Sequence, residues 1–341
     1  MRRLRVMVLM DEELVPPDSI EGVSDEEMLE WKTEYDVLVT LRDLSHHAEP
    51  LGVSDDLGAI RKFIEEFRPD IAFNLLEEFQ GVAVYDQHVV SYLELMKLPY
   101  TGCNPRGLML AHDKALSKQI LSYHRILTPR FAVFERGRSA TLRRNYTYPL
   151  LVKSVIEEAS LGISQKSIVH SPEQLKARIE YVHEELKTDA LVEEFIEGRE
   201  LYVGVIGNRR LQTLPIWEMT FKNLPDDMAN IATRRVKWDT AHQKELGVET
   251  NAAEDISKPT QAAISRLCKR VYRALSLSGY ARLDLRMTAD ERVYVLEANP
   301  NPNLSYGEDF AESAEAMGVS YEPLLQRILN LGLSYKPQWY G

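Results

Sequence analysis

The chain has 341 residues, of which 44% are hydrophobic and 27% are charged, and its formal net charge is −11. This composition is ordinary for a globular protein. The negative charge argues against a general binder of nucleic acid or of anionic membranes, because no basic field would gather phosphates.

The two cysteines, Cys103 and Cys268, lie far apart in the sequence and lack the spacing of metal ligands. This favours a reducing cytoplasm and no disulfide framework. The apolar run at the N-terminus is too short for a signal peptide, and no segment is long enough to span a membrane. We therefore expect a cytoplasmic protein of two or three subdomains.

Strands and helices alternate through the first third of the chain. The residue patterns predict strands over residues 6–10, 35–40 and 71–76, and helices over residues 56–67 and 82–96. Such alternation indicates a parallel sheet covered by helices. The acidic stretch 11–30 follows the first strand, at the edge of the sheet where ligands of such folds usually bind.

The middle of the chain contains a lysine in a setting that suits phosphate. The patterns predict a helix over residues 113–123, strands over 130–134, 149–154 and 166–170, and a helix over 172–186. Lys153 ends an apolar strand, and the Ser/Gly-containing loop 157–164 follows it. Backbone N–H groups and hydroxyls of such a loop can cradle a phosphate while the lysine supplies charge. Alone the signal is weak, since most lysines at strand ends point to solvent.

The last third begins with a predicted strand over residues 190–196. Gly207-Asn208 between apolar arms predicts a hairpin with a two-residue turn, and a long helix is expected over residues 260–275. The edge of the first strand, Glu193-Glu194-Phe195-Ile196, could bond a purine through its backbone, and Glu200 could accept ribose hydroxyls. The alternative is a solvated acidic rim.

Two alternating segments near the C-terminus, 280–287 and 293–299, predict a hairpin. If Thr288 pairs with Val293, Asp284 lies opposite Glu297, and the same register sets Arg282 opposite Asn299. Two directly opposed carboxylates destabilise a sheet unless something neutralises them. A divalent cation held by oxygen ligands, such as Mg²⁺, would do so. The alternative is a charged hairpin that faces solvent and is neutralised by Arg282 and Arg286.

Together these segments resemble the ATP-grasp superfamily, and most closely its D-alanine–D-alanine ligase branch, over nearly the whole chain. The residues that carry the resemblance are 99–102, 113–118, 152–153, 160–164, 192–200, 203–208, 282–284 and 297–299. The resemblance implies an α/β fold of the α+β ATP-grasp type. It further implies an N-terminal parallel α/β pre-ATP-grasp domain (1–105), a central ATP-grasp lid subdomain (106–190) and a C-terminal ATP-grasp subdomain with the metal site (191–341).

The resemblance also implies an activity and its cofactors. The expected reaction joins a small-molecule carboxylate to an amine through an acyl phosphate, with ATP and one or two Mg²⁺ ions (or Mn²⁺) as cofactors and ADP and phosphate as products. A homodimer is a further expectation, since relatives of this fold often dimerise.

Roles for individual residues follow from the same resemblance. The implied ATP-binding residues are Lys114, Lys153, Ser160, Gly162, Glu193, Glu194, Phe195, Ile196, Glu200 and Lys237. The implied metal ligands are Asp284, Glu297 and Asn299. Arg282 and Lys153 are the implied catalytic residues, Arg282 lying where charge develops on the tetrahedral intermediate.

The departures from the family concern the two substrate pockets. The His-Gly pair that the ligases carry in the first block is replaced by the stretch 76–79, and Trp238 stands for a tyrosine of the mobile loop. Glu308 stands near the place of a carboxylate-binding serine. The candidate substrate residues are Glu77, Glu78, Asn303, Ser305 and Glu308. We therefore expect a substrate other than plain D-alanine. The alternatives are a true D-alanine–D-alanine ligase and an inactive ATP-binding sensor or scaffold.

Overall fold

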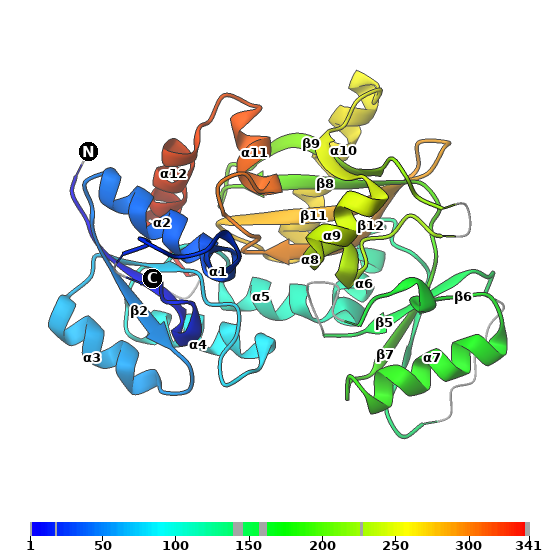
Figure 1. Ribbon diagram of the computed structural model, residues 1–341, viewed down its shortest axis with the longest axis horizontal. Coiled ribbons are helices and arrows are strands. Elements are labelled where there is room, and N and C mark those ends of the chain that lie inside the picture. The colour runs from blue at the N-terminus through cyan, green and yellow to red at the C-terminus, as the bar shows by residue number, and fades with distance from the viewer. Residues whose placement is uncertain (1, 18, 139–145, 157–161, 226–227, 338–341) are drawn as a thin grey trace.

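The computed structural model describes residues 2–17, 19–138, 146–156, 162–225 and 228–337. These residues form three sheets of three, four and five strands, which lie in three parts of an elongated molecule (Figure 1). The expected α/β architecture is confirmed.

The first sheet is parallel, with the strand order β2-β1-β3. Its strands are β1 (Arg5–Asp11), β2 (His47–Val53) and β3 (Ile71–Asn74). The helical elements around it are η1 (Glu12–Leu14), α1 (Asp25–Glu30), α2 (Lys32–Asp43), α3 (Leu57–Phe67), η2 (Ala83–Tyr85) and α4 (Asp86–Leu95). Side chains of β1 enter two different hydrophobic clusters, Met7 and Leu9 in one and Val6 and Val8 in the other. The sheet is therefore covered on both faces, as parallel sheets usually are.

The predicted strand over residues 35–40 is wrong, because these residues lie within α2. Their β-branched and aromatic side chains favour a strand locally, yet Val37, Leu38 and Leu41 are buried at helical spacing. Tertiary packing therefore overrides the local preference. Ala72 of β3 also forms a single parallel bridge with Tyr100.

The second sheet is antiparallel, with the order β4-β7-β5-β6. It is preceded by α5 (Pro105–His112) and α6 (Lys114–Tyr123) and consists of β4 (Phe131–Phe134), β5 (Leu150–Ser154), β6 (Ile168–Val169) and β7 (Ala190–Glu194), with η3 (Gln165–Ser167) before β6. Helix α7 (Pro172–Glu184) is capped by Ser171 and packs Leu175, Ile179 and Val182 into the core beneath the sheet.

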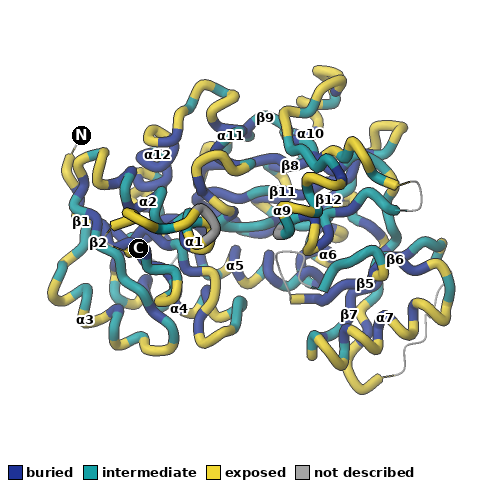
Figure 2. The backbone as a smooth tube through the Cα atoms, viewed as in Figure 1, coloured by how far each residue is buried: buried dark blue, intermediate teal, exposed yellow. Residues whose placement is uncertain are grey.

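The third sheet has the order β10-β9-β8-β11-β12, and its neighbouring strands are antiparallel. Its elements are β8 (Arg199–Ile206), β9 (Gln212–Phe221), α8 (Arg234–Trp238), α9 (Thr240–Leu246), β10 (Val248–Ala252), α10 (Lys258–Ala274), β11 (Tyr280–Met287), β12 (Val293–Pro300) and α11 (Asp309–Glu315). Figure 2 shows that β8 and β11 are the most deeply buried strands of this sheet. The predicted two-residue turn is wrong, because residues 207–211 connect β8 to β9.

The hairpin of β11 and β12 has the predicted pairs but not the predicted turn. Asp284 lies opposite Glu297, and Arg282 lies opposite Asn299. Val293, however, pairs with Met287 instead of Thr288, and a register shift after Asp284 restores the alignment. Such a bulge places two residues of one strand against one of the other.

The last helix, α12 (Tyr321–Ser334), returns to the first sheet. Its side chains Leu324, Leu325, Ile328 and Leu329 join the same hydrophobic cluster as Val6 of β1. Strand β7, in contrast, pairs with β4 and β5 and so belongs to the second sheet. We propose three subdomains that follow the three sheets, with β7 assigned to the central one and α12 packed on the first. No helix among the described residues is long and apolar enough to cross a bilayer.

Candidate active site

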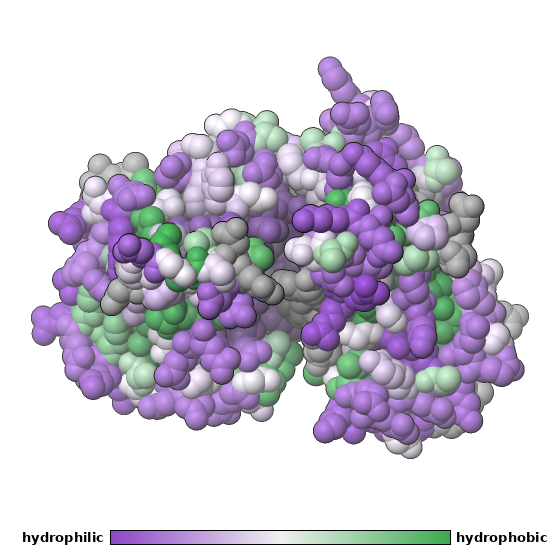
Figure 3. Space-filling model, in the orientation of Figure 1, coloured by the Kyte–Doolittle hydropathy of each residue, from purple (hydrophilic) through white to green (hydrophobic). Residues whose placement is uncertain are grey.

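A narrow pocket lies between the second and third sheets. Nine residues singled out in the sequence line it: Lys153, Glu193, Glu194, Phe195, Ile196, Glu200, Lys237, Asp284 and Glu297. The pocket also includes apolar side chains that the sequence did not single out, among them Leu151, Ile163 and Leu296. The face of the molecule in Figure 3 is mostly hydrophilic and is notched between the N-terminal part and the part that carries α7.

Two lysines bind one buried carboxylate at the wall of this pocket. Lys153 Nζ lies 3.0 Å from Glu193 Oε1, and Lys118 Nζ lies 2.9 Å from Glu193 Oε2. Burial alone would raise the pKa of Glu193, but the two ammonium groups outweigh it and hold this pKa below its usual range. The carboxylate is therefore charged and fixes both lysines. Lys118 was missed as a site residue, although it follows Lys114 by one helical turn.

Glu200 is paired with an arginine on the neighbouring strand. Arg286 lies opposite Glu200 in the β8–β11 register, and its Nη2 is 2.6 Å from Glu200 Oε2. The Tyr202 hydroxyl donates to the other carboxylate oxygen over 3.0 Å. Both oxygens are thus engaged, yet Glu200 and Arg286 line the pocket. Sequence reasoning treated Arg286 only as a neutralising charge for the hairpin, and its partner proved to lie on another strand.

The opposed carboxylates of the hairpin each lie near a cation. Arg282 Nε is 2.8 Å from Asp284 Oδ1 and its Nη2 is 3.0 Å from Oδ2, while Lys114 Nζ is 3.8 Å from Glu297 Oε2. Burial would raise the pKa of Glu297, but Lys114, Lys153, Lys237 and Arg282 together lower it to about 2. The expected contact between Arg282 and an acid of this hairpin is present, whereas Arg286 pairs with Glu200 instead.

The donor set of the hairpin fits a divalent cation shared with phosphate. Asp284 and Glu297 present hard oxygens on one face. The buried Asn299 amide nitrogen has no hydrogen-bond partner among the described residues, and as a donor it suits a phosphate oxygen, while the amide oxygen would be the ligand of the cation. Within those residues no three His, Cys, Asp or Glu side chains gather as a metal cage. Mg²⁺ usually takes only a few ligands from the protein, such as two carboxylates and an amide oxygen, and phosphate and water supply the rest.

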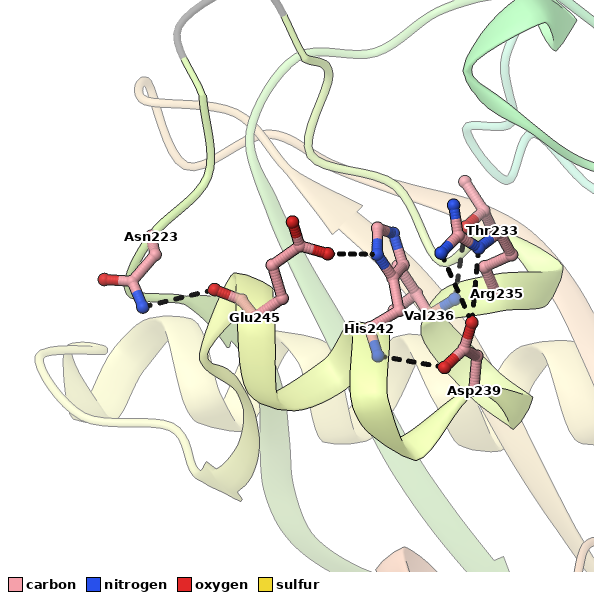
Figure 4. A network of polar contacts seen from close by, with 7 residues as sticks. All are labelled: Asn223, Thr233, Arg235, Val236, Asp239, His242 and Glu245. Atoms are coloured by element: carbon pink, nitrogen blue, oxygen red, sulfur yellow. Dashed lines mark hydrogen bonds and ion pairs between the residues drawn. The ribbon is translucent and has the colours of Figure 1, made fainter.

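Lys237 lies on the short helix α8. Side chains cap the N-terminus of α8 and the N-terminus of the following helix α9 (Figure 4). Thr233 Oγ1 accepts from Val236 N over 3.2 Å, and Asp239 caps the following helix α9 by accepting from His242 N over 2.9 Å. Arg235 binds the same Asp239 carboxylate across one turn. These contacts hold the α8–α9 corner, so that Lys237 lines the pocket.

Of the residues expected in the phosphate loop, Ser160 lies outside the described residues. Gly162 is described, but it is not among the pocket-lining residues. Its φ is +73°, and a Cβ there would lie 2.5 Å from a methyl carbon of Leu186. Its carbonyl accepts a hydrogen bond from Arg178. The backbone at Gly162 thus requires glycine, while the adjacent Ile163 enters the pocket.

The candidate substrate residues do not gather at one point. Glu77 and Glu78 are exposed after β3, and Glu308 is exposed before α11. Asn303 and Ser305 instead meet Thr33 of α2, at 3.0 Å and 2.6 Å.

Besides Asp284, a second acid lies near Arg282: Asp309, the residue after Glu308. Its Oδ2 lies 3.9 Å from Arg282 Nη1. Burial raises the pKa of Asp309 to about 6, against the lowering effect of Arg282. The sequence indicated an acid near this point but favoured the neighbouring position.

Comparisons with known proteins show which family the chain resembles. Residues 119–330 match the family described as "D-ala D-ala ligase C-terminus". The chain is 32% identical to the D-alanine–D-alanine ligase of Syntrophotalea carbinolica, over 90% of this chain and 92% of that protein. It is 30% identical to the uncharacterized protein y4sG of Sinorhizobium fredii, over 86% and 85% of the two chains. Its fold is similar to that of the D-alanine–D-alanine ligase of Bacillus anthracis complexed with ATP, with a TM-score of 0.73 and 23% identity over 97% of each chain.

Proposed function

Because the chain belongs to the D-alanine–D-alanine ligase family of ATP-grasp enzymes, we propose that it joins a small carboxylic acid to an amine through an acyl phosphate. Its membership makes it an ATP-dependent ligase that forms a peptide-like bond. The products of the nucleotide are then ADP and phosphate. The observation that carries the proposal is that seven residues expected to bind ATP and two expected metal ligands line one pocket.

The lysines and the strand β7 are proposed to bind the nucleotide. Lys114 and Lys153 would hold its phosphates, with Lys153 oriented by the buried Glu193 carboxylate. Backbone groups of residues 194–196 would bind the adenine, and Glu200 the ribose. The enclosed space of about 70 Å³ is far smaller than the roughly 300–1,000 Å³ of small-molecule sites. The pocket must therefore widen to admit ATP.

Asp284, Glu297 and Asn299 are proposed to hold one or two Mg²⁺ ions, or Mn²⁺, which would neutralise charge on the phosphates. Arg282 is proposed to stabilise the negative charge that develops when the amine attacks the acyl phosphate. The position of Arg282 directly opposite Asn299 in the β11–β12 register supports this role.

The acids around the substrate side support a substrate other than plain D-alanine. Asp309 lies 3.9 Å from Arg282, where it competes with any carboxylate that the acceptor would bring to that guanidinium. A like charge close to a partly desolvated carboxylate disfavours binding. Acceptors that lack a carboxylate or carry a second ammonium group avoid this conflict. Glu77 and Glu78 are proposed to hold the amine of the donor.

Two alternatives remain for the same fold: a true D-alanine–D-alanine ligase and an inactive ATP-binding protein. A coupled assay for ADP release, run with D- and L-amino acids, dipeptides and diamines, separates all three. The proposal expects ADP release that depends on a substrate pair other than two molecules of D-alanine. Efficient synthesis of D-alanyl-D-alanine supports the first alternative. ATP binding without turnover on any pair supports the second, and AMP as the stoichiometric product contradicts the acyl-phosphate route.

A further inference from the structure

A second cavity, of about 770 Å³, lies away from the candidate active site. Its walls come from the β8–β9 connection, the segment between α10 and β11, the end of α12 with the residues after it, and the start of α5. It shares no lining residue with the nucleotide pocket. Its size falls within the range of small-molecule sites.

The charge of this cavity has one sign. Five of its lining residues are cations: Arg106, Arg209, Arg210, Arg273 and Lys336. Within the described part of the chain, no Asp or Glu lines it. This contrasts with the formal net charge of −11 for the whole protein. Cations gathered around a concave surface focus a positive potential and attract anions.

The walls of the cavity are fixed by polar contacts. Asn208 Nδ2 donates to the Leu331 carbonyl over 3.0 Å, and Asn208 Oδ1 accepts from Gly279 N over 2.9 Å. On the other side, Asn104 Nδ2 donates to the Ser276 carbonyl over 2.7 Å. These bonds tie the β8–β9 connection to α12 and α5 to the segment before β11. The cations are therefore carried on a preformed frame, as expected for a ligand site.

The backbone of the β8–β9 connection directs two of the arginines. Gly207 has a φ of +134°, and a Cβ there would lie 2.2 Å from the Arg210 carbonyl oxygen. Only glycine fits this close approach. The tight connection sets Arg209 and Arg210 side by side at the rim, where both are exposed.

We propose that this cavity binds a small molecule that carries two or more phosphate groups. Arginine presents a planar fork of donors that matches phosphate oxygens, and four of the five cations are arginines. Ser276, Ser278 and Ser334 add hydroxyl donors, while Leu277, Leu331 and Tyr335 offer an apolar surface to the rest of the ligand. The site is separate from the ATP pocket, so its occupation does not depend on the ligase reaction.

The experiment measures binding of inorganic triphosphate by calorimetry. A Lys153→Ala background weakens binding of the probe at the nucleotide pocket and isolates the second site. In this background we expect binding with one site per chain that weakens as salt is raised. The double variant Arg209→Ser/Arg210→Ser should weaken it at least tenfold.

The matched control is Arg61→Ser/Lys62→Ser, which removes two adjacent exposed cations from α3. It should leave the affinity unchanged, and both double variants should keep the melting temperature of the parent. Equal affinities of the two double variants would overturn the site. Citrate is the second probe, and citrate binding as tight as that of triphosphate would overturn the assignment to phosphate.

Discussion

Asp284 and Glu297 face each other across β11 and β12, and each carboxylate has a cation of its own. Arg282 binds Asp284 with two nitrogens, while Lys114 approaches Glu297 from α6. The two acids would repel each other without these partners. The cations lower the pKa of Glu297 to about 2 despite its burial, so this carboxylate is ionised at neutral pH. An ionised Glu297 is what the proposed metal site requires.

The variant Glu297→Gln should abolish turnover and preserve the fold. It removes one proposed metal charge but keeps the size of the side chain, and loss of a metal ligand costs several kcal/mol in phosphoryl transfer. We expect kcat to fall at least a hundredfold (about 2.7 kcal/mol), with little change in melting temperature. Glu291→Gln on the turn of the same hairpin is the control. Near-parental activity of Glu297→Gln would show that the hairpin does not hold the metal.

The variant Lys118→Met should destabilise the protein. Lys118 is 1% exposed and shares the Glu193 carboxylate with Lys153. Removing one partner of a buried ion pair typically costs about 3–5 kcal/mol, because the remaining charge is left less compensated. Denaturant unfolding measures this loss. Lys176→Met, which removes an exposed lysine from α7, should change stability by no more than about 0.5 kcal/mol.

Local sequence patterns predicted the strands that carry the site residues better than they predicted which distant residues those side chains contact. The alternation over residues 280–287 correctly predicted a strand, and Leu283, Leu285 and Met287 of that strand are buried in one hydrophobic cluster. The pairing of Asp284 with Glu297 was also right, although the assumed turn was wrong and a bulge compensated for it. Such a bulge leaves no clear mark in the alternation of a short strand.

Contacts between distant segments could not be predicted in the same way. The approach of Asp309 to Arg282 depends on how the loop after β12 folds back. The return of α12 to the first sheet depends on the packing of apolar faces that many other helices also possess. His46 is a further case, since it is buried and its Nε2 lies 3.0 Å from Oε1 of Gln326, which is 280 residues away in the sequence.

The substitution Glu34→Gln should stabilise the protein relative to the parent at neutral pH, and it should do so by less at acidic pH. Burial, with the nearby charges of Glu77, Asp11 and Asp36, raises the pKa of Glu34 to about 7. The folded state therefore binds this proton more tightly than the unfolded chain. The associated stability is fully present below about pH 4 and is lost as pH rises through about 7.

Glutamine stays neutral at every pH and does not incur this loss. The difference in unfolding free energy between variant and parent should thus grow by about 2–3 kcal/mol between pH 4.5 and 8. Denaturant unfolding at several pH values tests it. Glu30→Gln, at an exposed position, should give no such trend, and a flat difference for Glu34→Gln would contradict the raised pKa.

Plain D-alanine should be a poor acceptor, and Asp309→Asn should improve it. The acceptor of a D-alanine ligase carries a free carboxylate, which needs an uncompensated cation. Arg282 is already neutralised by Asp284 at 2.8 Å and approached by Asp309 at 3.9 Å. Above about pH 6 Asp309 is charged, so its removal should raise kcat/KM for D-alanine about tenfold or more, equivalent to about 1.4 kcal/mol. The gain should be smaller at pH 5, where Asp309 is mostly protonated.

The control for this prediction is Glu308→Gln, which makes the same change of charge at the adjacent, exposed position. If the charge next to Arg282 determines which acceptor binds, Asp309→Asn should raise kcat/KM for D-alanine more than Glu308→Gln does. A diamine or another acceptor without a carboxylate should lose efficiency in Asp309→Asn, because the acid that would attract its second ammonium group is gone. Equal effects of the two variants would mean that general acidity, and not the contact with Arg282, excludes D-alanine. Robust D-alanyl-D-alanine synthesis by the unmodified protein would refute the argument altogether.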